Sequence, residues 1–323
     1  MIRAPKPCHI PQPKFRRLPR RYMTVCVAAI CDNGKTIILV SDRMIGPGFI
    51  ESEPNINKVV KLHSQWWLLF AGDDISPVFD IIDSSKEVIK NKNVAAKLQP
   101  DDPAHLQAVM DAVRESYEKK RMEQAESLYL KPIGWDIASF NASAGGPNCL
   151  PDFGEIKAKI ADYVLNIELL VAGFSEGTAY VFSLIGREGA IVNRHDLPGF
   201  YSIGSGGTGA IFMMYYRDLS YKTIAREAIY YAMEAKLFGE QASGVGEDTD
   251  LYVATADGKV ITFSEDAIET GLVKVWDKLR PRWIGKESRA ILNSLPELTS
   301  FEKLKEEKKK RKKPGKKKPP PSP

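Results

Sequence analysis

Hydrophobic residues in the first part of the chain form short runs that polar turn residues separate. The runs at 24–31 and 36–42 flank the tripeptide Asp32-Asn33-Gly34, and an Asn-Gly turn between two β-branched runs is typical of a β-hairpin. A second pair of runs, at 58–62 and 65–71, predicts two more strands. We therefore expect this part of the chain to form antiparallel strand pairs.

Two helices are predicted next. The first should follow Gly72, with Asp73 or Asp74 as its cap, and run to about residue 90. The second should begin near Pro103, behind two aspartates at 101 and 102, and run to about residue 130. Its apolar residues recur at helical spacing: Leu106, Val109, Met110 and Val113.

Strands and helices then alternate again. Residues 131–165 contain Gly and Pro and follow no clear period, so we interpret them as an irregular insertion. The remaining predicted elements are strands at 167–173, 179–185 and 190–193, helices at 208–217 and 222–238, strands at 251–256 and 259–263 around an Asp-Gly turn, and a helix at 265–279. Antiparallel hairpins that alternate with helix pairs favour an α+β fold, in which helices cover both outer faces of two stacked sheets.

Composition agrees with a globular domain. The 323 residues are 43% hydrophobic and 27% charged, close to the average for soluble proteins, and no apolar stretch approaches the length of a membrane span. The cysteines, Cys8, Cys26, Cys31 and Cys149, form neither a disulfide framework nor a zinc-binding spacing. We expect a soluble, reduced, cytoplasmic protein without a metal or cofactor.

Positive charge is concentrated at the two ends of the chain. Residues 1–22 carry seven Lys/Arg and no acid, and residues 301–323 carry eleven Lys/Arg against three acids, whereas the whole chain has a net charge of +5. The body between the tails is therefore acidic. We expect a disordered basic leader at 1–22, one domain at 23–281, and a C-terminal extension at 282–323 that ends in a disordered Lys/Pro-rich tail. Neither a membrane nor a nucleic acid is an expected partner.

Short segments between about residues 24 and 263 carry the candidate chemistry. They are Thr24 at the start of the first strand, Asp42-Arg43 at the end of the second, Lys58 sixteen residues after Asp42, Phe70-Ala71-Gly72, YSIGSGG at 201–207, and GEQASG at 239–244. In this order and at these intervals they resemble the proteasome β-subunit type of N-terminal nucleophile (Ntn) hydrolase, as found in bacterial proteasome-like peptidases. The resemblance implies a four-layer αββα sandwich.

The resemblance also implies a threonine peptidase. A threonine hydroxyl needs an adjacent base to act as a nucleophile, and the α-amine of a chain that begins at Thr24 would serve, because its ordinary pKa of about 7.7–8.0 lies near neutrality. Lys58 would be a buried cation beside Thr24, and Asp42 its anionic partner. Gly72 would donate its backbone N–H to the oxyanion.

Further roles come from the resemblance alone. Ser205, Glu240 and Ser243 would surround the α-amine and relay protons, and Met44 and Phe70 would contact the substrate. The substrate would be a peptide or an unfolded protein. The subunits would assemble into a homo-oligomeric ring, with an unfoldase partner that the sequence does not identify.

The chain departs from the family pattern near the nucleophile. Thr24 lies eighteen residues before Asp42, two more than the usual interval, so strict counting would place the nucleophile at Cys26. A hairpin that is longer by two residues keeps the alternation of side chains and favours Thr24. Glu240 stands where the family has Asp. Met23, in place of the Gly of self-cleaving propeptides, suggests translation from Met23 and exposure of Thr24 by methionine removal.

Three other interpretations remain open. In the first, the chain is a non-catalytic ring or scaffold subunit. In the second, Asp42 and Lys58 form only a structural salt bridge. The third is nucleotide binding, because Gly204–Gly209, GSGGTG, fits the GxGxxG pattern between a strand and a helix.

Overall fold

A computed structural model describes most of the region predicted to be the domain. The described residues are 24–43, 57–72, 74–99, 102–146, 150–186, 190–241 and 245–279. The chain divides into two compact units, residues 1–272 and 273–323, and the second is described only at 273–279, which includes helix α8 (Lys274–Leu279). Both predicted basic tails lie outside the described residues.

The first sheet is built around the predicted N-terminal hairpin. Its strands are β1 (Cys26–Cys31), β2 (Thr36–Asp42), β8 (Phe200–Ile203), β9 (Thr249–Thr255) and β10 (Val260–Thr262), in the order β10-β9-β2-β1-β8. Every described pairing in it is antiparallel. All residues of β1 and β2 are buried, which explains their nearly continuous apolar runs. The connecting residues Asp32, Asn33 and Gly34 all have positive φ, as the Asn-Gly turn predicts.

The second sheet is also antiparallel throughout its described pairings. Its strands are β3 (Val59–His63), β4 (Trp66–Gly72), β5 (Ile167–Ser175), β6 (Thr178–Ile185) and β7 (Val192–Arg194), hydrogen-bonded in chain order. The strands predicted in this region are confirmed. Residue Phe70 pairs with Leu169, and Gly72 pairs with Ile167, so the end of β4 and the start of β5 lie together.

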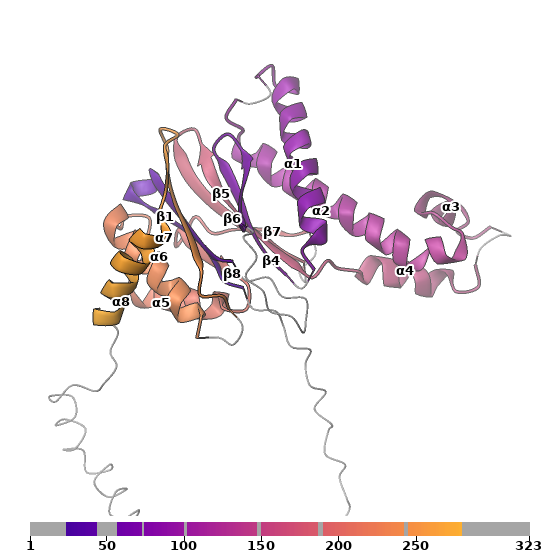
Figure 1. The fold of residues 1–323 in the computed structure, drawn as a ribbon. Coiled ribbons are helices and arrows are strands. Elements are labelled where there is room, and N and C mark those ends of the chain that lie inside the picture. Colours follow the sequence, from indigo (N-terminus) through magenta and orange to yellow (C-terminus); the bar gives the residue numbers. More distant parts are fainter. Residues whose placement is uncertain are drawn as a thin grey trace, which may run out of the picture. The chain divides into compact units, whose positions relative to one another are not determined.

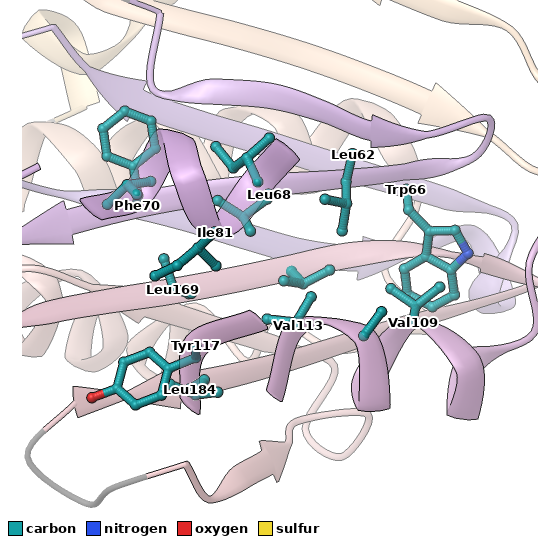
Figure 2. Close-up of a cluster of buried hydrophobic side chains, with 14 of the residues drawn as sticks. Leu62, Trp66, Leu68, Phe70, Ile81, Val109, Val113, Tyr117, Leu169 and Leu184 are labelled. Atoms are coloured by element: carbon teal, nitrogen blue, oxygen red, sulfur yellow. The ribbon is translucent and has the colours of Figure 1, made fainter. Parts of the chain in front are cut away.

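Helices α1 (Ser76–Ala95) and α2 (Leu106–Tyr129) cover one face of the second sheet (Figure 1). Their apolar stripes bury Ile81, Val109 and Val113 against strand residues such as Leu68 and Leu169 (Figure 2). Each such side chain contributes about 1.5–3 kcal/mol by leaving water. For α2, the helical period read from the sequence thus corresponds to the buried face.

The other face of the second sheet packs against the first sheet. Ala28 and Leu39 of the first sheet share a buried cluster with Leu69, Leu170 and other residues of the second. Helices α5 (Gly207–Tyr216) and α6 (Ala225–Gly239) pack against β8 and against β1 and β2 respectively, as Figure 1 shows. The protein is therefore α+β, with two antiparallel sheets and helices packed on them. None of the described helices combines the length and hydropathy of a bilayer-spanning helix.

The prediction that residues 131–165 are irregular is wrong. This segment contains α3 (Ile137–Ala142) and α4 (Phe153–Asp162), which form a small apolar cluster with the end of α2 around Phe140 and Ile160. Asp136 caps α3, because its carboxylate accepts the N–H of Ser139 at 2.7 Å. Helices of six and ten residues are too short for a clear periodic pattern, and tertiary contacts stabilise them.

The predicted caps of the first two helices also differ from the structure. The residue before α1 is Ile75, although Asp74 does accept the N–H of Ser76 at 2.9 Å. The residue before α2 is His105, and the carboxylate of Asp102 accepts the N–H of Gln99 at 2.8 Å. Asp102 therefore stabilises the loop between the helices. The predicted last helix is confirmed at 265–279, with a π-helical stretch at Ile268–Val273.

Candidate active site

Thr24, Asp42 and Lys58 meet at one end of the stacked sheets. The ammonium of Lys58 donates to the hydroxyl Oγ1 of Thr24 at 2.9 Å and to Oδ1 of Asp42 at 2.9 Å. The side chains of Lys58 and Asp42 are 2% and 0% exposed. The sheets bring the residues together, because Thr24 precedes β1, Asp42 ends β2 and Lys58 precedes β3.

The buried Asp42 carboxylate also receives backbone donors. The N–H of Val25 donates to Oδ1 at 3.0 Å, and the N–H of Gly246 donates to Oδ2 at 3.3 Å. A buried ion pair is stable only when its remaining polar atoms find partners. These N–H groups therefore hold the carboxylate, and through it the ammonium, in one position beside Thr24.

The turn that follows β8 encloses the backbone of Thr24. The N–H of Gly206 donates to the carbonyl oxygen of Thr24 at 3.2 Å, and Gly204 has a φ of +86°. A Cβ on Gly204 would lie 2.1 Å from the same carbonyl oxygen, so only glycine allows this approach. The N–H of Gly204 in turn donates to the Glu168 carboxylate at 2.7 Å.

Gly204→Ala is expected to displace Thr24 and to abolish the peptidase activity that the sequence predicts for this site. Gly258→Ala is the matched control, since Gly258 has nearly the same φ, +84°, but open space around its Cβ position. Both variants should lose about 1–3 kcal/mol from backbone strain, and only Gly204→Ala should lose activity. Urea unfolding and an activity assay separate the two effects. Full activity in Gly204→Ala would show that the close approach to Thr24 is dispensable.

The other predicted site residues differ in how far the structure describes them. Gly72 ends β4, where a Cβ would lie 2.6 Å from the carbonyl oxygen of Asn166, so the backbone there requires glycine. Ser205 is exposed, in the turn between Gly204 and Gly206. Two predicted residues, Met44 and Ser243, lie outside the described residues.

The resemblance implies that Glu240 lies beside the α-amine of Thr24, but its described partner is a lysine. Its carboxylate binds the ammonium of Lys236, one helical turn earlier. Burial raises the pKa of Glu240, while the Lys236 ammonium acts in the opposite direction. The described contacts of Glu240 therefore place it in a cluster around Lys236.

The prediction that Phe70 contacts substrate is wrong. Its side chain is fully buried in the cluster between the second sheet and α1 (Figure 2), where it packs edge-on against Phe79. Side chains alternate along a strand, so the ring points away from the first sheet. The backbone carbonyl of Phe70, by contrast, accepts a hydrogen bond from the thiol of Cys26 at 3.5 Å.

Cys26, the nucleophile by strict counting, is in a poor environment for that role. It is fully buried, and burial raises the pKa of its thiol far above the ordinary value. The thiolate is the reactive form of cysteine. In addition, the Lys58 ammonium bonds to Thr24. The geometry thus favours Thr24 over Cys26.

The strand pairing contradicts a dinucleotide-binding unit at Gly204–Gly209. Such a unit needs parallel strands joined through a helix. Here β8 pairs antiparallel with β1, and β9, which follows α6, pairs antiparallel with β2. Gly204 instead allows the close approach to Thr24, and Gly206 allows close packing against Val25 and Gly239.

Three residues of the site were not predicted from the sequence. Glu168 holds the turn after β8, Gly246 holds Asp42, and Lys236 binds the segment that contains Gly246. Their partners are ten or more residues away in the chain, and a backbone donor or acceptor leaves no side-chain signal. A hint exists only for Lys236, which has Glu240 four residues later on the same helix.

A scan against models of protein families finds no match to this chain, and a search of curated proteins finds no significant match. Among the residues that the structure describes, no three His, Cys, Asp or Glu side chains gather as they would around a metal ion.

Proposed function

We propose that the protein is a threonine-type peptidase of the Ntn-hydrolase class, with the fold of a four-layer αββα sandwich. One observation carries the proposal: a buried ammonium, that of Lys58, lies 2.9 Å from both the Thr24 hydroxyl and the Asp42 carboxylate. Burying such a pair is costly, and a hydroxyl beside it is the arrangement that an activated nucleophile needs. The helices packed on two stacked antiparallel sheets support the fold assignment.

In the proposed reaction, Thr24 Oγ1 attacks the scissile carbonyl carbon and its proton passes to the α-amine of Thr24. The Lys58 ammonium stabilises the negative charge that develops on the hydroxyl oxygen as the proton leaves. The C–N bond then breaks, the leaving amine takes this proton from the α-ammonium of Thr24, and an ester to Thr24 remains. Water hydrolyses this ester by the same proton transfers in reverse order, which restores the hydroxyl.

The carbonyl oxygen becomes negatively charged in each tetrahedral intermediate. We assign its stabilisation to the backbone N–H of Gly72, at the end of β4. Such a donor is typically worth about 2.7–4 kcal/mol in the transition state. The mechanism requires Thr24 to be the first residue of the active form, so that its nitrogen is an amine. Assembly into a ring stays a prediction.

A peptide epoxyketone tests this proposal sharply, because it bonds to both the hydroxyl and the α-amine of an N-terminal threonine. We expect a stable adduct on a peptide that begins at Thr24, detected by intact-mass and peptide mass spectrometry. Protein with an acetylated N-terminus is the matched control and should not form the cyclic adduct. Protein that starts at Thr24 but forms no adduct and cleaves no peptide would favour a non-catalytic scaffold subunit.

A further inference from the structure

A second buried ammonium, that of Lys236, lies behind the candidate site. Lys236 is in the last turn of α6, and its side chain is 0% exposed. Its Nζ donates to the backbone carbonyls of Gly246, Glu247 and Asp248 at 3.1, 2.8 and 3.3 Å, and it binds the Glu240 carboxylate. Three consecutive carbonyls and one carboxylate thus converge on a single cation.

This arrangement has the chemistry of a site for a monovalent cation, with the ammonium in the place of the ion. An ammonium has three N–H donors, fewer than the four oxygens around Nζ, so charge as well as hydrogen bonding holds the cluster together. Rings of carbonyl oxygens replace the hydration shell of K⁺ in the same way. The position near the helix C-terminus adds a favourable interaction with the helix dipole.

The segment that Lys236 binds also contacts the candidate catalytic pair. Gly246 accepts the Lys236 ammonium through its carbonyl, and its N–H donates to Oδ2 of Asp42. The other oxygen of Asp42 binds Lys58, which binds Thr24. A continuous chain of hydrogen bonds therefore runs from Lys236 to the Thr24 hydroxyl.

We propose that Lys236 is a positioning residue, a built-in cation that orders residues 246–248 so that the Gly246 N–H orients Asp42 and, through it, Lys58. The inference rests on the proposed function, because it concerns the reactivity of Thr24. Without a cation, the four oxygens would repel one another, and the segment would move away from Asp42. A displacement of about 1 Å in such a support can cost about 10²-fold in rate.

Chemical rescue tests this inference. In Lys236→Ala, the rate of Thr24 modification by the epoxyketone and kcat for peptide hydrolysis should both fall about 10²-fold, with a smaller change in KM. Millimolar methylammonium should restore most of both rates, because it places an ammonium among the same oxygens. Choline, which is too bulky, should not. Lys236→Met should show the same loss without rescue, since its side chain fills the space.

Arg217→Met is the control for general weakening of the helices, because Arg217 binds Glu234 of α6 through two hydrogen bonds and does not contact Asp42. This variant should keep its rates or lose them without amine rescue. Wild-type rates in Lys236→Ala, or a loss that methylammonium and choline restore equally, would overturn the inference.

A readout without activity separates this inference from the proposed function. Methylammonium should raise the unfolding temperature of Lys236→Ala but not that of Lys236→Met, because a ligand that binds only the folded form stabilises it. The measurement also serves if Lys236→Ala is too unstable to assay. If the wild-type protein is not a hydrolase, this rescue should still occur; if methylammonium has no selective effect, the cation site itself is disproved.

Discussion

Replacing Thr24 by alanine is expected to abolish peptide hydrolysis, with a loss on the order of 10⁶-fold in kcat, the scale measured for removal of an acyl-enzyme nucleophile. The hydroxyl that accepts a hydrogen bond from the Lys58 ammonium would be absent, and no acyl-enzyme could form. Folding should be nearly unchanged, because only a hydroxyl and a methyl group are removed. Steady-state hydrolysis and epoxyketone labelling, with circular dichroism as the folding check, measure the result.

Two matched variants separate the hydroxyl from its surroundings. Thr24→Ser keeps a nucleophilic oxygen and should retain labelling, and Cys26→Ser should retain substantial hydrolysis. A thiol-alkylating reagent applied to the folded protein should modify neither Cys26 nor Cys31. Burial raises the pKa of both thiols, that of Cys31 to about 12. An inactive, folded Cys26→Ala together with an active Thr24→Ala would instead identify a cysteine nucleophile and contradict the Thr24 assignment.

Lys58→Met should abolish hydrolysis and also lower the free energy of unfolding by about 3–5 kcal/mol, because it leaves the Asp42 carboxylate buried without its cation. Asp42 is 0% exposed, so the negative charge cannot be solvated without a structural change. Denaturant unfolding measures the stability, and hydrolysis by the folded fraction measures the catalytic loss.

The double variant Lys58→Met/Asp42→Asn distinguishes a catalytic pair from a structural salt bridge. It contains no uncompensated charge, so it should recover part of the lost stability; the Asn amide still leaves one of the two backbone N–H groups at this position without an acceptor. Its hydrolysis should remain absent, because the cation beside Thr24 is still missing. Hydrolysis in the double variant at a rate within a few-fold of wild type would show that the pair is only structural.

Local patterns in the sequence predicted much of the fold correctly. The hairpin at 24–42 followed from two apolar runs around Asn33-Gly34, because asparagine and glycine tolerate positive φ. Helix α2 followed from the helical period of its buried face, and helix α1 followed from the strand-to-helix junction after Gly72. Each of these signals depends only on residues close together in the chain. The short helices α3 and α4 lack such a signal, since their stability depends on packing with the end of α2.

Spacing also brought out the central residues of the candidate site. Thr24, Asp42 and Lys58 stand at the ends of predicted strands, and the structure joins them through the Lys58 ammonium. Strand length and alternation determine where such end residues point. Phe70 shows the limit of this reasoning, because it lies on the same strand as Gly72 but its ring faces the α1 side of the sheet.

The sequence by itself thus determined the strands, the longer helices, the antiparallel hairpins and the residues at the strand ends, because propensity and alternation are local properties of the chain. Only the tertiary structure decided which groups support those residues. The N–H of Gly246 reaches Asp42, and Glu168 reaches Gly204, through backbone donors that have no side-chain signature. Lys236 binds carbonyls ten to twelve residues away, and its partners are set by how the chain after α6 folds back on the first sheet. Such contacts depend on three-dimensional packing, which no local pattern records.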